Sequence, residues 1–461
     1  MENLFLRSFT DFPAHCIRAP LLHLIADPFY QPLSECIQYF SDALLVIQNG
    51  IVLDLGSYVD LSEKYAALPT VCYLDRLILP GLIDTHIHYP QSEIVAAYGE
   101  QLLAWLNRYT FPAEQKFSDF DYALTIAEHF LTELLRHGTT TALVFTTVYP
   151  QSTDAFFQAA QRRNFRMIAG KVLMDRHAPN ALLDTPETAY ADSKRLIEQW
   201  HKVDRLLYAV TPRFAITSTP EQLAVADRLL QEFPDVYLHT HLAENKDELD
   251  WTAKLFPEAR SYLDVYRQSG LVGDRSVFAH GIHLNEEDLT VLSECGCAIA
   301  HCPTSNFFLG SGLFPMHKAK DPSRPIEVGL GTDVGGGTSF SLLQTGGEAY
   351  KVAQLQQRTL TPFQALFLAT LGGAKALSLE DKIGNLLPGK EADFIIVDPQ
   401  ATATLGLRNQ ACLQVLQGDS AGLVTEQIVD SLRSLIFSLL ILGDDRVISK
   451  AYVAGEIAHS R

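Results

Sequence analysis

Two histidines one residue apart, His86 and His88, end an apolar run in the stretch LPGLIDTHIHYPQSEI (79–94). On a β-strand, residues i and i+2 point to the same face, so both imidazoles would converge on one spot. Two convergent imidazoles suit zinc or another divalent metal better than they suit an apolar core. The pair alone also fits a polar strand end with two solvated histidines, so the rest of the chain has to decide.

Metal-competent side chains recur further along the chain, each near the end of another short apolar run. His241 is followed by Glu244, His280 lies in SVFAHGIHL, and Asp333 belongs to GLGTDVGGG. Each histidine alone is as well explained as an ordinary core or surface histidine. Their repeated position at the ends of apolar runs favours one shared metal site.

The elements that would position these residues follow a regular alternation from about residue 78 onward. Helix-like stretches such as 119–137, 186–202 and 220–232 separate short β-branched runs, and Thr219 before Pro220 is a good N-cap for the last stretch. Eight β units separated by helices predict an α/β fold, a (β/α)8 TIM-like barrel with its active site where the strands end. The predicted strands are 78–84, 139–145, 166–174, 206–214, 236–244, 276–284, 297–306 and 327–335.

The two ends of the chain have a different pattern. LLVIQNGIVLDLG places two apolar runs around Asn49 and Gly50, which indicates a β-hairpin. After residue 387, LPGKEADFIIVDP and RVISKAYVAGEIAH predict further short strands without intervening helices. We therefore expect a small β-sandwich domain formed by both chain ends. Its parts are 1–77 and 376–461, the latter with a tail, and the barrel spans 78–375.

The bulk composition limits the possible functions. With 461 residues, 47% hydrophobic and 20% charged, the chain has the composition of a soluble globular enzyme. Its net charge of −18, without a Lys/Arg-rich run, argues against a nucleic-acid partner.

The cysteines and the apolar stretches bear on the compartment. Seven cysteines without a CxxC motif do not form a disulfide framework, and Cys295 and Cys297 are expected to be buried thiols in a reducing cytosol. The start, MENLFLRSFTDFPAH, lacks the pattern of a signal peptide, and LIFSLLILG (435–443) is too short to cross a bilayer. We expect a cytoplasmic protein with no membrane partner.

The candidate residues stand in a sequence that resembles the guanine deaminase family of the amidohydrolase superfamily. HxH and HxxE are signals of the whole superfamily, whereas the Gln after HYP, the Arg-Phe after TP and the FPxE segment are specific to this family. The resemblance covers about 78–375 and is carried by PGLIDTHIH with the following YPQ, WLNRYTFPAE (105–114), TPRF (211–214), HLAEN (241–245) and LGTDVGGG (330–337). It implies a zinc-dependent hydrolase that deaminates guanine to xanthine and ammonia in purine catabolism or salvage, working as a homodimer.

The resemblance also implies roles for individual residues. Glu244 would shuttle protons, Asp333 would accept a proton from the attacking water, and His280 would orient that water or the substrate. One zinc ion, with iron as the alternative, would be held by His86, His88, His241 and Asp333. The purine would be held by Gln91, Arg213 and Phe214, in contact with His88, His241 and Asp333.

Two details bear on the number of metals. His239 lies on the same strand face as His241 and could compete as a ligand, but Glu244, three residues after His241, favours the latter and leaves His239 facing inward behind the site. Members of the superfamily with two metals bridge them by a carbamylated lysine on strand four. LLYAVTPRF contains no lysine, and Lys171 lies on strand three. We therefore predict one metal.

The predicted chemistry is that of a metal-activated water. The metal lowers the pKa of the water to roughly 7–9, so that a hydroxide can attack C2 of guanine while Glu244 protonates the adjacent ring nitrogen. Arg213 can only donate hydrogen bonds, so it would bind the C6 carbonyl of guanine but would face another donor in the C6 amino group of adenine. Plainer interpretations remain for each pocket residue: Phe214 as core, Arg213 as a surface ion pair and Gln91 as a loop residue.

Two rival functions remain at this level. A related deaminase or aminohydrolase acting on another purine, a pterin or a triazine would share the metal ligands and differ at Gln91 and Arg213. A non-catalytic barrel scaffold would be expected to lose metal ligands, and this sequence retains all of them together with Glu244.

Overall fold

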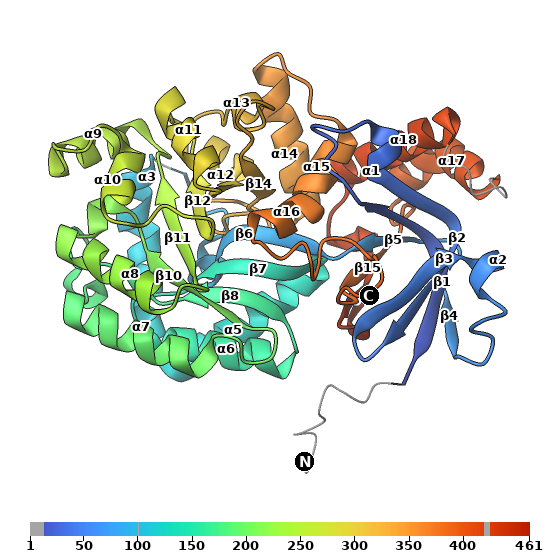
Figure 1. Ribbon diagram of the computed structural model, residues 1–461, viewed down its shortest axis with the longest axis horizontal. Helices are drawn as coiled ribbons and strands as arrows, with labels where there is room; N and C mark the ends of the chain where they lie inside the picture. Colours follow the sequence, from blue (N-terminus) through green and yellow to red (C-terminus); the bar gives the residue numbers. More distant parts are fainter. Residues whose placement is uncertain (1–12, 100, 419–424) are drawn as a thin grey trace, which may run out of the picture.

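Eight parallel strands form a nearly closed barrel in the computed structural model, which describes residues 13–99, 101–418 and 425–461 (Figure 1). Neighbouring strands pair in the order β14-β13-β12-β11-β10-β8-β7-β6, and the Thr85 hydroxyl closes the ring by donating to the carbonyl of Leu330 at 2.9 Å. The predicted barrel is therefore confirmed. Its strands are β6 (Leu82–His88), β7 (Thr139–Phe145), β8 (Arg166–Gly170), β10 (Leu207–Pro212), β11 (Tyr237–Leu242), β12 (Ser276–His280), β13 (Ala298–His301) and β14 (Glu327–Leu330), and a short β9 (Val172–Leu173) pairs with β10.

Helices cover the outside of the barrel, and several begin at side-chain caps, among them the predicted cap Thr219. Asp119 accepts a hydrogen bond from the backbone N–H of Tyr122, and the Thr219 side chain accepts one from that of Gln222. These side chains satisfy N–H groups that have no partner within the helix. The covering helices are α5 (Phe120–Arg136), α6 (Pro150–Arg162), α7 (Pro186–Trp200), α8 (Pro220–Glu232), α10 (Tyr262–Gln268), α11 (Glu286–Glu294), α14 (Leu342–Leu355), α15 (Pro362–Leu368) and α16 (Leu371–Ala376).

Several barrel strands end earlier than predicted, for local reasons. β12 stops at His280, where positive φ angles at His280 (73°) and Gly281 (58°) turn the chain. The predicted strand 297–306 is half helix, because Pro303 starts α12 (Pro303–Phe308), and proline favours the first turn of a helix. The residues after each strand are therefore free to form the walls of the site.

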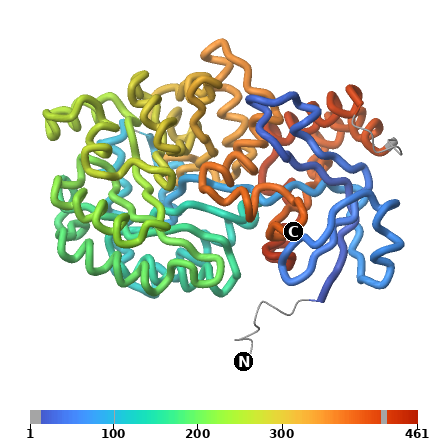
Figure 2. The backbone as a smooth tube through the Cα atoms, viewed as in Figure 1, coloured from blue at the N-terminus to red at the C-terminus, as the bar shows by residue number. Residues whose placement is uncertain are grey.

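A second, eight-stranded sheet combines both ends of the chain, which Figure 2 shows side by side in blue and red. Its order is β17-β16-β15-β5-β1-β2-β3, with β4 paired to β1. Asn49 (φ 52°) and Gly50 (φ 76°) form the predicted tight turn between β2 and β3, since this turn needs positive φ at both positions. The strands are β1 (His15–Leu24), β2 (Ile37–Gln48), β3 (Ile51–Ser57), β4 (Thr70–Cys72), β5 (Leu77–Pro80), β15 (Phe394–Val397), β16 (Ile448–Val453) and β17 (Glu456–Ser460).

The expectation that no helix intervenes after residue 387 is wrong. α17 (Ala403–Gly418) and α18 (Glu426–Leu442) lie between β15 and β16 and pack against one another (Figure 1). The apolar stretch 435–443 belongs largely to α18, whose buried residues Leu432, Leu435 and Leu439 recur at helical spacing and face the core. None of the helices in the described part of the chain is both long and apolar enough to span a membrane.

A buried cluster of charges joins the small sheet to the barrel. Glu391, just before β15, pairs with Arg166 and with Arg205, the latter at 2.5 Å, and Arg205 also pairs with Asp393. Arg166 begins β8 and Arg205 precedes β10. Charges this deeply buried are tolerated when each finds an opposite charge and hydrogen bonds, so the cluster fixes where the sheet docks.

The cysteines agree only in part with expectation. All seven lie within the described residues and no disulfide links them. Cys297 is buried as predicted, but Cys295 is exposed, because it follows the last turn of α11 before Gly296 turns the chain back into the barrel. The N-terminal stretch 1–12, to which most of the signal-peptide expectation applies, lies outside the described residues.

Candidate active site

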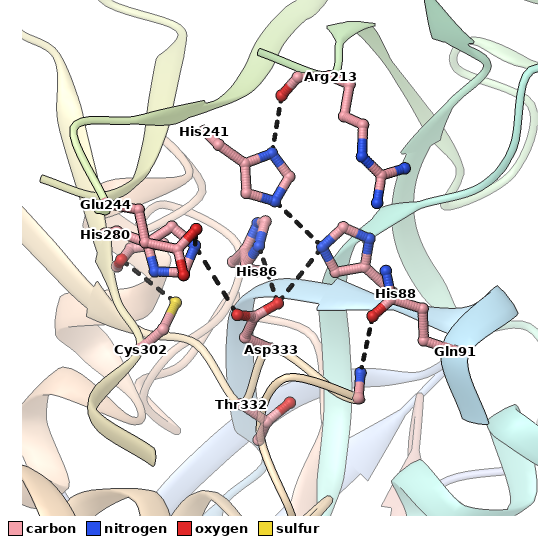
Figure 3. A network of polar contacts seen from close by, with 12 residues as sticks. His86, His88, Gln91, Arg213, His241, Glu244, His280, Cys302, Thr332 and Asp333 are labelled. Atoms are coloured by element: carbon pink, nitrogen blue, oxygen red, sulfur yellow. Dashed lines mark hydrogen bonds and ion pairs between the residues drawn. The ribbon is translucent and has the colours of Figure 1, made fainter. Parts of the chain in front are cut away.

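Four side chains from three strand ends meet at the mouth of the barrel (Figure 3). Nε2 of His86 lies 3.2 Å and Nε2 of His88 lies 3.3 Å from Oδ1 of Asp333, which follows β14. Nε2 of His241, on β11, lies 3.2 Å from Nε2 of His88. One ligand atom from each of the four can be chosen so that all lie within 4.8 Å of one another. The structure thus brings together the four residues that the sequence proposed as ligands.

The imidazole rings of His241 and His86 each have a contact on the side away from the cluster, and these contacts set the orientation of the rings. His241 donates from Nδ1 to the carbonyl oxygen of Arg213 at 2.7 Å, which leaves Nε2 with a lone pair toward the cluster. Nδ1 of His86 lies 2.8 Å from Nε2 of His239, so His239 stands behind His86 as expected. Nε2 of His86 is buried and has no hydrogen-bond partner among the described residues. Lone pairs that converge on a carboxylate fit a bound cation.

Burial sets the charge of the cluster. It lowers the pKa of His88 to about 3 and that of His241 well below its usual range, so both imidazoles are neutral. Burial alone would raise the pKa of Asp333, but the ring nitrogens of His86 and His88, at 3.2 and 3.3 Å from its carboxylate, outweigh burial and hold that pKa well below its usual range. Three neutral imidazoles and one carboxylate are a ligand set that suits a divalent metal.

A second combination of possible ligands overlaps the first. His86, His280, Cys302 and Asp333 also offer atoms within 4.8 Å of one another. Burial raises the pKa of the Cys302 thiol well above its usual value, and Sγ donates to the carbonyl of Ala300 at 3.4 Å. A protonated thiol is a poor metal ligand, so the three-histidine set is the better one.

Glu244 and His280 stand beside the cluster on the side away from His88. Oε2 of Glu244 lies 3.5 Å from Nε2 of His280, which lies 3.7 Å from Oδ2 of Asp333. The hydroxyl of Ser311 donates to Oε1 of Glu244 at 3.3 Å. Burial, and then the charge of Asp333, raise the pKa of Glu244 to about 8. At neutral pH Glu244 is therefore mostly protonated and can act as an acid.

The loop that carries Glu244 is held by the start of α9 (Lys246–Leu255). Asn245 caps this helix, and Oε2 of Glu248 accepts from the backbone N–H groups of Glu244 (2.8 Å) and Asn245 (3.0 Å). This capping box orders the chain between the strand end and the helix. The carboxyl of Glu244 is thereby held toward the pocket.

A pocket of about 390 Å³ opens in front of the cluster. Arg213 and Phe214, which follow β10, form one wall, and Gln91 from the short helix Tyr89–Ile94 forms another. Gln91 Oε1 accepts from the N–H of Gly335 at 3.1 Å, so its amide nitrogen remains as a donor. The pocket is lined by His88, Gln91, Leu102, Trp105, Leu106, Arg213, Phe214, His241, Glu244, Leu309, Asp333 and Gly336.

The cluster, the acid and the pocket in front of them invite comparison with known proteins. The Amidohydrolase family model matches residues 77–457.

The chain belongs to the amidohydrolase family.

Among the relatives of this amidohydrolase, guanine deaminase of Escherichia coli K12 is 52% identical over 434 residues, which cover 94% of each chain. The solved structure of E. coli guanine deaminase superposes with a TM-score of 0.90 at 49% identity, covering 97% of this chain and 100% of that one. Guanine deaminase from C. acetobutylicum with guanine bound in its active site superposes with a TM-score of 0.84 at 27% identity, covering 96% and 100%.

Three further residues of the amidohydrolase site were not assigned roles from the sequence. Glu114 is fully buried against the Arg213 guanidinium, Asn306 contacts Nδ1 of His280 at 2.8 Å through its Oδ1, and Ser311 binds Glu244. The FPxE motif contains Glu114, but only the folded chain shows what its carboxylate touches. Lys171 is not near the cluster, since it pairs with Asp184 behind the strands.

Proposed function

We propose that this amidohydrolase is a guanine deaminase, which hydrolyses guanine to xanthine and ammonia. The observation that carries the proposal is a single pocket that holds the donor groups of Arg213 and Gln91 opposite the buried acid Glu244 and the His/Asp cluster. The curated guanine deaminases among its relatives support the same substrate.

We assign the metal to His86, His88, His241 and Asp333, with one zinc ion per chain and iron as the alternative. A bound divalent metal lowers the pKa of water and supplies hydroxide at neutral pH. The support is the convergence of ligand atoms described above, among which Nε2 of His86 has no hydrogen-bond partner. The second combination of possible ligands shares His86 and Asp333 with the first and includes the protonated thiol of Cys302, so one metal is the better proposal.

Residues of the protein carry out the proton transfers. Asp333 takes the proton from the attacking water, and His280, whose Nε2 faces both carboxyls, orients that water. Glu244 protonates the ring nitrogen next to C2, which makes C2 electrophilic. After a new C2–O bond forms, the ionised Glu244 takes the proton of the new C2 hydroxyl and passes it to the amino group. The C2–N bond then breaks to release ammonia rather than amide ion and leaves the C2 carbonyl of xanthine, and the proton held by Asp333 returns Glu244 to its acid form.

The pocket residues read the base. Arg213 donates to the C6 carbonyl of guanine, and the free amide N–H of Gln91 donates to a further acceptor on the ring. Phe214 offers an aromatic face for stacking. The rims of His88, His241 and the Asp333 carboxylate complete the contacts around C2.

We further propose that the enzyme is a homodimer and works in the cytoplasm. The family resemblance supports the dimer, and the unpaired cysteines support a reducing compartment.

The proposed function is tested by ammonia release from guanine, adenine, cytosine and a pterin. We expect guanine to be preferred by at least about a hundredfold in kcat/KM, because a site built to bind a carbonyl is left unsatisfied by an analogue without one. Preference for a pterin, or no reaction with guanine by protein that contains metal, would refute the assignment.

A further inference from the structure

The guanidinium that faces the pocket is itself held by a buried carboxylate. Glu114 is the last residue of α4 (Phe111–Glu114) and is 0% exposed. Its two oxygens both accept from Nη1 of Arg213, at 2.8 and 3.0 Å. Glu114 does not line the pocket, whereas Arg213 does. The carboxylate therefore grips one edge of the guanidinium from outside the pocket.

The same short helix supports the arginine on a second side. The ring of Phe111 lies 5.6 Å from Cζ of Arg213, a favourable cation–π distance. The backbone N–H of Arg213 donates to the carbonyl of Leu173 at 3.2 Å, which fixes where the side chain starts. A long, flexible side chain is thus held at its base, along its face and at one terminal nitrogen.

Without Glu114, other carboxylates in the pocket would draw Arg213 away from this position. The pocket also contains Glu244 and the carboxylate of Asp333, either of which attracts a guanidinium. An arginine that turned toward Asp333 would compete with the metal ligands and stop pointing at the base.

We propose that Glu114 is a positioning residue that makes Arg213 a reader of the C6 substituent of the substrate. The proposal rests on the proposed function, because it deepens the account of how that site selects guanine. With Nη1 engaged by Glu114, the remaining N–H groups of Arg213 stay directed at C6 and cannot rotate away from a wrong substituent. Arg213 then donates hydrogen bonds to a C6 carbonyl but cannot bind a C6 amino group, because arginine has no hydrogen-bond acceptor.

Three purines with an amino group at C2 isolate this effect. Guanine carries a carbonyl at C6, 2,6-diaminopurine carries an amino group, and 2-aminopurine carries hydrogen. All three present the same leaving group to Glu244. Guanine also carries a proton on N1 that the other two purines lack, so the effect of each variant is expressed relative to the wild type with the same purine, which cancels these intrinsic differences.

The test measures kcat and KM for the three purines in the metal-loaded wild type, Glu114→Ala, Glu114→Gln, Arg213→Ala and the double alanine variant. We expect Glu114→Ala to lower kcat/KM for guanine about 10- to 100-fold, mostly through KM, because a displacement of about 1 Å can cost about a hundredfold. The value for 2-aminopurine should change less than threefold, and Glu114→Gln should lie between wild type and Glu114→Ala. In the Arg213→Ala background, Glu114→Ala should cause no further loss.

A matched control comes from the next turn of the chain. Lys116 pairs with Glu93 at the surface and lies outside the pocket, so Lys116→Ala removes an ion pair from the same segment without touching Arg213. It should leave all three substrates unchanged. Glu114→Gln, which keeps the side-chain volume, protects the test against a Glu114→Ala variant that fails to fold.

Three results would overturn the proposal. Equal losses for guanine and 2-aminopurine, or a full Glu114→Ala effect in the Arg213→Ala background, would show a general structural role. Crystal structures of Glu114→Gln and Glu114→Ala give a reading that needs no substrate, and an Arg213 that keeps its position in them would refute the mechanism. If the wild type released no ammonia from guanine, the proposed function would fail, and these structures would still decide whether Glu114 positions Arg213.

Discussion

Replacing Glu244 by Gln separates proton transfer from every other property of the site. The amide keeps the size of the carboxyl and can still accept the hydrogen bond from Ser311, but it cannot cycle a proton. We expect the metal and guanine to bind, with kcat reduced by about 10²-fold or more, the usual contribution of a general acid–base group. The loss should fall on kcat and not on KM, because the ground-state contacts survive.

The structure also predicts what the substitution does to stability. The pKa of Glu244 in the folded protein is about 8, well above the 4.5 of an ordinary Glu, because burial and then Asp333 oppose its charge. Below pH 4.5 such an acid is protonated in both the folded and the unfolded protein, so its raised pKa does not lower the free energy of unfolding. The loss of stability grows as the pH rises toward 8. At pH 7 this cost is about 3 kcal/mol, which Gln would not incur. The metal-free Glu244→Gln protein should therefore be more stable than the metal-free wild type at pH 7, and the gap should close near pH 4.5.

The assay combines stopped-time ammonia release, metal analysis and urea unfolding of the metal-free proteins at pH 4.5, 6 and 7. Glu248→Gln is the control for turnover, because it removes another buried carboxyl four residues away while keeping an acceptor for the N–H groups of Glu244 and Asn245. Burial also raises the pKa of Glu248, to about 7, so this variant should gain stability over the same pH range, but less than Glu244→Gln. Near-normal turnover of Glu244→Gln would show that another group, such as His280, carries the proton. A stability gap that does not change with pH would refute the account of the buried acid.

Metal analysis should find one equivalent per active chain, and two equivalents would refute the single-metal site. His86→Ala should lose both metal and activity. His239→Ala removes only a contact behind His86, so it should weaken metal binding about 10- to 100-fold and still bind metal that is supplied in excess. If His239→Ala lost the metal and His86→Ala kept it, His239 would be the ligand. Arg213→Ala should lower kcat/KM for guanine about 30- to 1,000-fold with metal retained, and an unchanged value would mean that Arg213 does not read the base. Glu391→Gln should lower the free energy of unfolding by about 3–5 kcal/mol at pH 7, because the buried Arg166 loses its charged partner and the buried Arg205 keeps only Asp393. Burial alone would raise the pKa of Glu391, but the charge of Arg205 and further arginine contacts lower it, so this difference should fade in urea unfolding as the pH falls below the usual range of a Glu.

Much of the site could be predicted because barrel enzymes carry their catalytic and ligand residues at the ends of the strands. His86 and His88 share a strand face whatever the rest of the fold does, and the spacing from His241 to Glu244 crosses one strand end. The order of the motifs along the chain then follows the order of strands around the barrel. One error lies between β15 and β16, where no helix was expected although the buried leucines of α18 recur at helical spacing.

The amino-acid sequence by itself determined the strand–helix alternation, the hairpin at Asn49, and the types of residue available for catalysis. These follow from periodicity, turn preferences and ligand chemistry, which act over a few residues. Only the tertiary structure decided that Nε2 of His239 contacts Nδ1 of His86, that burial makes Glu244 an acid at neutral pH, and that the carboxylate of Glu114 binds Arg213. Each of these depends on groups about 70 to 150 residues apart in the sequence, and on the exclusion of water from between them, which no local pattern encodes.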